Sequence, residues 1–196
     1  MTAAFLPEPP STPAVAAAYR DDLASDGYVN NLTRVWCWRP DVLASFQNTR
    51  ADLLAGSTLS SREVAVLVAA TAAAREDSYC ALAWGSRLAE LSDEATAARV
   101  LRGVDPGLSE RETALAGWAR QVVRDPNATT EGDARRLRDA GLSDQEIFEA
   151  TTLVAFRLAF STVNDALGAR PDPPLAQRAP GLVREAVTFG RPVQDL

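Results

Sequence analysis

A five-residue phrase that is typical of helix starts occurs twice in this chain, about fifty residues apart. It reads L-S-S-R-E at residues 59–63 and L-S-E-R-E at residues 108–112. In each copy a serine precedes a glutamate by three residues, which is the spacing of a capping box. Apolar, alanine-containing runs follow both copies. Each phrase therefore predicts the start of a helix that buries at least one face.

A second phrase, Leu-Ser-Asp, is also duplicated, at residues 91–93 and 142–144, each time after one copy of the first phrase. Two echoed helix starts in the same order favour an internal duplication. We expect the repeats to cover about residues 40–104 and 105–170. The alternative is that Leu-Ser is a common way to begin a helix, and the second half also contains a loop that the first half lacks.

Apolar residues recur at helical spacing in nearly every segment, while β-branched runs are scarce, so we expect an all-α fold. Residues 1–170 are predicted to form a single all-α domain. The longest helix should run from about Ser143 to Leu167 and stop at Gly168; its many apolar residues indicate a helix that is central or covered by a partner subunit. Residues 171–196 form a proline-rich tail with room for one short amphipathic helix, which either packs across a neighbouring subunit or frays.

The overall composition excludes several classes of protein. The net charge of the 196 residues is -6, which argues against a nucleic-acid partner. No apolar run reaches the ~20 residues of a membrane span. The first thirteen residues lack the basic and apolar regions of a secretory signal, and two cysteines are too few for a disulfide framework. We therefore expect a cytoplasmic protein with reduced thiols and no membrane association.

One of the two cysteines, Cys80, directly follows two carboxylates in the stretch R-E-D-S-Y-C-A-L-A-W-G. If a single helix runs through this stretch, Glu76 and Asp77 share a face with the sulfur. Their charges would raise the pKa of the thiol above its ordinary value of ~8.5. The same geometry suits a carboxyl that serves as an acid or a base. The remaining alternative is a core cysteine, since free cysteines are often buried.

The groups that usually assist a reactive thiol are missing. The chain has no histidine, and therefore lacks the commonest proton shuttle and metal ligand. Cys37 lies between two tryptophans, which is typical of a core position. Cys80, Glu76 and Asp77 do not have the spacing of a zinc site, and neither a glycine-rich phosphate loop nor a G-x-S-x-G motif occurs. We expect no metal and no cofactor.

Several segments, taken in order, are similar to a known family. They are R-P-D-V-L-A-S-F, L-S-S-R-E-V-A-V-L-V-A-A, S-Y-C-A-L-A-W-G-S-R-L, L-S-E-R-E-T-A-L and D-A-L-G, within about residues 5–174. Their order and spacing resemble the peroxidase-related branch of the alkylhydroperoxidase D-like, carboxymuconolactone decarboxylase superfamily. The resemblance implies an all-α fold built on a duplicated helical core, assembled as a homo-oligomer.

The resemblance also implies a site. Active members carry Cys-x-x-Cys at a helix start, a histidine one turn later and a glutamate on the preceding helix. One sulfur attacks the hydroperoxide and the other resolves it as a disulfide. On this sequence the attacking cysteine is Cys80, the other cysteine falls on Asp77, and the histidine falls on Trp84. The glutamate falls near Ala65, two residues after Glu63.

The resemblance therefore implies a peroxidase-related protein with a degenerate thiol site and weak or absent peroxidase activity. If the activity is absent, the protein is a pseudoenzyme. One alternative is a one-cysteine hydroperoxide reductase, an antioxidant oxidoreductase centred on Cys80. Another is a non-redox small-molecule enzyme that uses acid–base chemistry. A small-molecule ligand near Cys80 and other copies of the chain are the expected partners. The candidate residues are Cys80, Asp77, Glu76 and Tyr79 for the chemistry, and Trp84 and Glu63 for the pocket.

Overall fold

The computed structural model describes residues 4–104 and 106–194, and all regular structure in these ranges is helical. The all-α prediction is therefore confirmed. The helix starts predicted at the two L-S-x-R-E phrases coincide with observed ones. The helices are α1 Pro13–Ser25, α2 Asn31–Trp36, α3 Pro40–Ala55, α4 Ser61–Ala74, α5 Ser78–Leu91, α6 Glu94–Leu101, α7 Glu110–Arg124, the 3₁₀ turn η1 Pro126–Ala128, α8 Glu131–Asp139, α9 Asp144–Ala166, α10 Pro173–Arg178 and α11 Gly181–Ala186.

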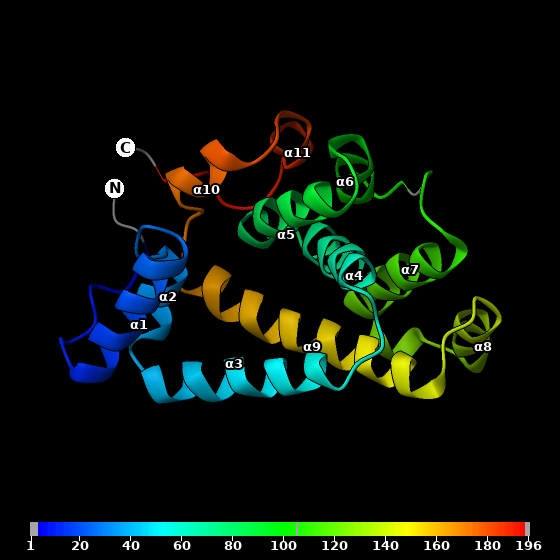
Figure 1. The fold of residues 1–196 in the computed structure, drawn as a ribbon, viewed down its shortest axis with the longest axis horizontal. Coiled ribbons are helices and arrows are strands. Elements are labelled where there is room, and N and C mark those ends of the chain that lie inside the picture. Colours follow the sequence, from blue (N-terminus) through cyan, green and yellow to red (C-terminus); the bar gives the residue numbers. More distant parts are fainter. Residues whose placement is uncertain (1–3, 105, 195–196) are drawn as a thin grey trace.

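The central helix of the fold is α4, which packs against α5, α6, α7 and α9 (Figure 1). Its residues 64–72 are all buried, so this helix is apolar on every side. The longer α9 buries one face and leaves Phe148 on its other face 67% exposed. Gly168 follows α9 with a φ of 78° and ends the helix as the sequence predicts. Among the described residues, no helix has both the length and the apolar character to cross a membrane.

The two copies of the L-S-x-R-E phrase pack against each other and exchange ion pairs. Both predicted capping boxes form, at the starts of α4 and α7. Arg62 of the first copy pairs with Glu112 of the second at 2.6 Å, and Arg111 of the second pairs with Glu63 of the first at 2.5 Å. Such a reciprocal exchange is the pattern of two elements related by a two-fold axis. It supports a duplicated core in which α4 and α7 occupy equivalent places.

The two Leu-Ser-Asp phrases also begin helices, but they cap them differently. Asp93 caps α6 by accepting a hydrogen bond from the backbone N–H of Thr96 at 2.8 Å. In the second phrase the cap is the serine and not the aspartate: Ser143 caps α9 through a capping box with Glu146. The resulting helices have 8 and 23 residues. The order of elements is thus repeated, while the lengths of the repeated helices have diverged.

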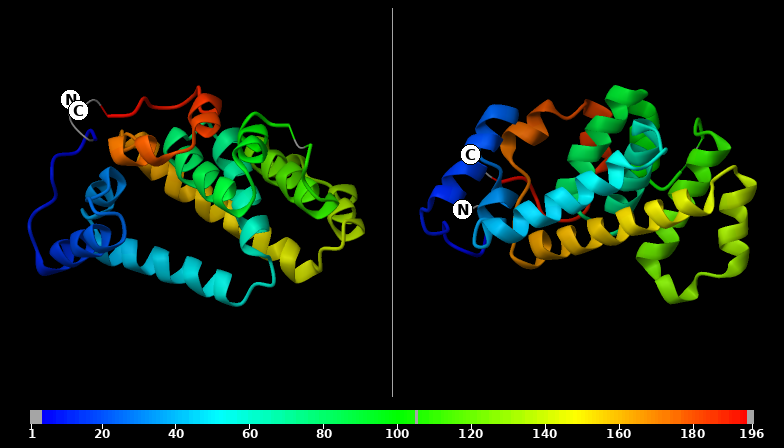
Figure 2. Two further views of the ribbon diagram at one scale, coloured as in Figure 1. Left: turned by 45° about the horizontal axis from the view of Figure 1, so that its top comes forward. Right: turned by 60° about the horizontal axis from the view of Figure 1, so that its bottom comes forward.

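The C-terminal tail turns back onto the core of its own chain. Its two short helices, α10 and α11, lie against α5 and α6 (orange and red over green in Figure 2). Val183 of α11 is fully buried there. The expected short amphipathic helix therefore forms as α11, and its apolar face is covered within the same chain.

A close backbone contact anchors the end of this tail beside the start of α5. Ser78 donates a side-chain hydrogen bond to the carbonyl of Arg191 at 2.7 Å. Gly190 has a φ of 72°, and a Cβ there would lie 2.5 Å from the carbonyl oxygen of Glu76. Only glycine tolerates both constraints.

Replacement of Gly190 by alanine should detach the tail locally while the core stays folded. The clash and the positive φ together should cost about 1–3 kcal/mol, which the tail can avoid by lifting away. Hydrogen exchange should therefore become about tenfold faster at residues 188–194 and stay unchanged in α4. Unchanged protection of the tail amides would contradict this anchor.

Candidate functional site

The environment of Cys80 is set by Asp77, the N-cap residue of α5. One carboxylate oxygen of Asp77 accepts the backbone N–H of Cys80 at 2.9 Å, and the side chain is fully buried. Aspartate is among the preferred N-cap residues because its oxygen satisfies an unpaired amide of the first turn. The position at which the resemblance implies a second cysteine thus carries a helix-capping carboxylate.

The second oxygen of Asp77 connects the thiol site to α9. Ser161 donates its hydroxyl proton to this oxygen at 2.5 Å, and the same hydroxyl oxygen lies 3.9 Å from the sulfur of Cys80. A hydroxyl has one proton to donate, and the shorter contact takes it. The lone pairs of Ser161 therefore face the thiol. The three side chains form a path along which a proton can pass from Cys80 through Ser161 to Asp77.

A buried arginine lies on the same face of α9, one turn before Ser161. Arg157 is 8% exposed, and its guanidinium lies over the ring of Trp84 at 4.8 Å from the centroid. Its Nε has no hydrogen-bond partner among the described residues. Burial lowers the pKa of Arg157, and the neighbouring sulfur of Cys80 opposes this effect.

The pKa of the Cys80 thiol is raised well above its ordinary value. Burial is the largest cause, and the negative charge of Asp77 adds to it. The positive charge of Arg157 acts in the opposite direction without reversing the shift. The thiol is therefore protonated at neutral pH, and the thiolate form needed for nucleophilic attack is scarce.

Three of the predicted site residues lie away from the thiol. The prediction that Glu76 shares a helical face with Cys80 is wrong, because Glu76 precedes the helix with a φ of 58° and is exposed. Tyr79 is buried, but its hydroxyl donates to Asp172 at the base of the tail. The carboxylate of Glu63 is engaged in its capping box and in the ion pair with Arg111. Of the predicted site residues, Asp77 is hydrogen-bonded to Cys80, and Trp84 contacts Arg157 beside it.

Two residues of the site, Arg157 and Ser161, were not predicted from the sequence. They come from α9, about eighty positions after Cys80, where apolar residues dominate. A usable signal was present, because Arg157, Ser161 and Asp165 are spaced by four and form a polar stripe on one helix face. Asp165 extends this stripe. Its pKa is raised to about 6, mainly by burial and to a smaller extent by the negative charge of Asp77.

A small cavity adjoins this cluster on the side of Arg157. Its volume is about 220 Å³, and α3, α5 and α9 contribute its walls. Trp84 lines it, and its role as a substrate-pocket residue stays a prediction. The remaining lining residues are Phe46, Gln47, Arg50, Arg157 and Phe160.

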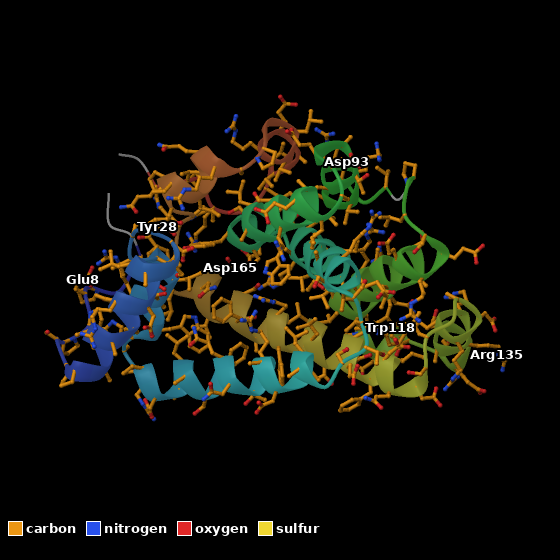
Figure 3. The ribbon with its side chains drawn as sticks, in the orientation of Figure 1. Glu8, Tyr28, Asp93, Trp118, Arg135 and Asp165 are labelled. Carbon is orange, nitrogen blue, oxygen red and sulfur yellow. The ribbon has the colours of Figure 1, made fainter. Side chains whose placement is uncertain are left out.

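A larger cavity of about 570 Å³ lies between α7 and α8, beside Trp118. Figure 3 labels Trp118 and Asp165 near opposite ends of α9, so this cavity is remote from the thiol end of the helix. Asp133, one of its charged groups, serves in the capping box of α8. The cavity holds no thiol, and we take the cluster around Cys80 as the candidate site.

Comparison with known proteins identifies the fold. Neither a family model nor a curated protein matches the sequence. The chain is similar to the alkylhydroperoxidase AhpD core structure of an uncharacterized peroxidase-related protein from Ralstonia eutropha JMP134. The TM-score is 0.80 and the identity 22%, over 89% of this chain and 95% of that chain. The chain is also similar to an uncharacterized peroxidase-related protein from Silicibacter sp. TM1040. The TM-score is 0.79 and the identity 22%, over 88% of this chain and 94% of that chain.

The fold is also similar to that of the debrominase Bmp8. The TM-score is 0.73 and the identity 12%, over 92% of this chain and 96% of that chain. For a cysteine-to-alanine variant of Bmp8 in complex with 2,3,4-tribromopyrrole, the TM-score is 0.71 and the identity 13%, over 87% of this chain and 94% of that chain. The chain therefore has the AhpD-like all-α fold, and the sequence resemblance is confirmed at the level of the fold.

Proposed function

We propose that this chain is a peroxidase-related protein in which Cys80 supports weak or no hydroperoxide reductase activity. The observation that carries the proposal is the buried carboxylate of Asp77, which caps the helix of Cys80 where a second thiol would be needed. Attack on a hydroperoxide requires a thiolate, and resolution requires another sulfur. Cys37 packs with Val15 and Leu43 in a cluster separate from that of Cys80, and both cysteines are free.

The chemistry left to a single thiol is limited. When Cys80 transfers its proton through Ser161 to Asp77, the sulfur can attack the distal oxygen of a hydroperoxide. The O–O bond then breaks, the alkoxide takes the proton back from Asp77 and leaves as the alcohol, and the sulfur becomes a sulfenic acid. Two electrons have passed from sulfur to peroxide, and an outside thiol must supply two electrons before a second turnover. The raised pKa of Cys80 makes even the first step slow.

The test is peroxide consumption in the presence of an external dithiol, combined with trapping of sulfenic acid at Cys80. We expect the wild type to consume peroxide no faster than a Cys80→Ala variant, with little trapped sulfenic acid. Fast, Cys80-dependent turnover would overturn the proposal and establish a one-cysteine peroxidase instead.

A second candidate is non-redox acid–base chemistry, which the buried pair of Asp77 and Ser161 favours. This pair can accept and return a proton without any change in the sulfur. In that case, turnover of a small-molecule substrate should survive Cys80→Ser and fall in Asp77→Asn. The opposite ranking of the two variants would exclude this candidate.

We also propose that the chain self-associates in the cytoplasm, as the resemblance implies. Large apolar side chains on the surface support self-association, including Trp38 at 42% and Phe148 at 67% exposure. Their burial between copies would remove apolar surface from water. Sedimentation analysis should give a mass above that of one chain, and a single-chain mass would refute this part of the proposal.

A further inference from the structure

We infer that the cavity between α3, α5 and α9 binds a small aromatic carboxylate, whose carboxylate pairs with Arg157 and whose ring lies among the aromatic walls. The inference deepens the proposed function, because it names the class of ligand that lies beside the Cys80 site. It rests on three independent features of the cavity, namely its charge, its walls and its size.

The charge of the cavity is positive and incompletely paired. Arg157 is buried, and its Nε lacks a hydrogen-bond partner among the described residues. A buried guanidinium without full pairing is costly, and a bound anion would offset that cost. Arg50 lies close enough for its charge to lower the pKa of Arg157. Neither arginine forms an ion pair in the part of the chain that the structure describes.

Asp77, the carboxylate whose charge acts on Arg157, does not fulfil this role. Asp77 acts on the pKa of Arg157 through its charge, but its oxygens accept the N–H of Cys80 and the hydroxyl of Ser161. The guanidinium therefore retains donors for a carboxylate from outside. Arginine suits such a ligand because its planar fork matches the two oxygens of a carboxylate.

The walls of the cavity favour a flat, apolar body attached to that carboxylate. The rings of Phe46 and Phe160 are stacked at 5.6 Å between centroids, and Trp84 lies beneath the guanidinium of Arg157. Aromatic rings prefer offset-stacked or edge-to-face neighbours, so a planar ring is better accommodated than a branched aliphatic chain. The amide of Gln47 adds one further polar group.

The size of the cavity limits the ligand to about one ring. A volume of about 220 Å³ lies below the ~300–1,000 Å³ of pockets that take drug-sized molecules. A benzoate-sized anion is therefore the appropriate probe. Inorganic phosphate and acetate carry the charge without the ring, and benzamide carries the ring without the charge.

The experiment is calorimetric titration of the whole chain with benzoate, benzamide, inorganic phosphate and acetate. We expect benzoate to bind at least about tenfold more tightly than each of the other three. Arg157→Met, which keeps the apolar stem and removes the charge, should weaken benzoate binding by about tenfold or more. Arg50→Met, at a partly exposed position, should weaken it by a smaller factor. Arg87→Met is the matched control and should leave binding unchanged, because this exposed arginine of α5 pairs with Glu90 and with no other carboxylate among the described residues.

The inference would be overturned if benzamide or phosphate bound as tightly as benzoate. It would also be overturned if benzoate bound the Arg157→Met and Arg50→Met variants as tightly as the wild type. Absence of benzoate binding would also overturn it. The titration contains no peroxide, so its failure leaves the proposed thiol chemistry untouched. A Cys80→Ser variant should still bind benzoate, which keeps the two proposals separable in the other direction as well.

Discussion

Replacement of Asp77 by cysteine should create a protein that forms a disulfide with Cys80 and consumes hydroperoxide, whereas the wild type does neither. The substitution removes the negative charge that helps to raise the pKa of Cys80. It also places a second thiol three residues before Cys80, at the N-terminal end of α5, where the helix dipole favours a thiolate. A lower pKa of Cys80 increases the fraction of its thiolate form at neutral pH. Peroxide consumption with an external dithiol, together with the mass of the oxidised protein, checks the prediction.

The matched control is Asp77→Ser, because serine caps a helix about as well as aspartate but carries neither charge nor sulfur. In this variant Cys80 should be alkylated faster than in the wild type, yet no internal disulfide should form. If Asp77→Ser consumed peroxide as fast as Asp77→Cys, a second thiol would not be needed for activity, and this would contradict the account. An Asp77→Cys protein that stays inactive while its disulfide forms would also contradict the account.

Replacement of Arg111 by methionine should give the largest loss of stability among single changes at the interface of the two repeats. Arg111 pairs with Glu63 at 2.5 Å and with Glu146 at 2.7 Å, and both carboxylates are largely buried. Its removal leaves both of them without a cation. Because solvent near these helix ends screens part of the effect, we expect a loss of about 2 kcal/mol in the free energy of unfolding at neutral pH. Denaturant unfolding of the two proteins measures it.

The loss should depend on pH in a defined direction. The pKa of Glu146 is lowered from 4.5 to about 2, and the hydrogen bond from Arg111 is the largest cause. A depressed carboxyl pKa stabilises the fold above pH 4.5, and this contribution disappears as the pH falls towards 2. The difference between Arg111→Met and wild type should therefore shrink over that interval. Arg62→Met is the matched control at the equivalent place in the first repeat. It should cost less because, within residues 4–104 and 106–194, Arg62 pairs with Glu112 alone. Equal losses in the two variants would contradict this ranking.

The parts of the fold that depend on neighbouring residues could be predicted from the sequence. Ser60 and Ser109 cap their helices because the glutamates that complete the capping boxes lie only three residues further on. The all-α class and the duplicated core follow from the same local signals. The prediction for Glu76 failed because it assumed one continuous helix. The backbone instead turns through a positive φ at Glu76 before Asp77 starts α5.

The parts of the site that depend on tertiary contact could not be predicted in this way. Ser161 and Arg157 reach Cys80 only because α9 packs against the central α4. Nothing within a few residues of either one indicates a thiol neighbour. In the same way, Tyr79 is next to Cys80 in sequence, yet its partner is Asp172 from the base of the tail. Adjacency along the chain was a poor guide to which side chains share the site.

Burial and the charge of Asp77 together hold Cys80 as a neutral thiol. The most direct measurement is the Cβ chemical shift of isotope-labelled cysteine as a function of pH, because it reports ionisation without requiring a reagent to reach the buried sulfur. Cys37 is the internal comparison, since burial raises its pKa to about 11. Because the pKa of Cys80 is raised, we predict that its signal remains that of a thiol well above the ordinary thiol pKa of ~8.5. A transition of Cys80 to the thiolate shift below pH 9 would contradict the account.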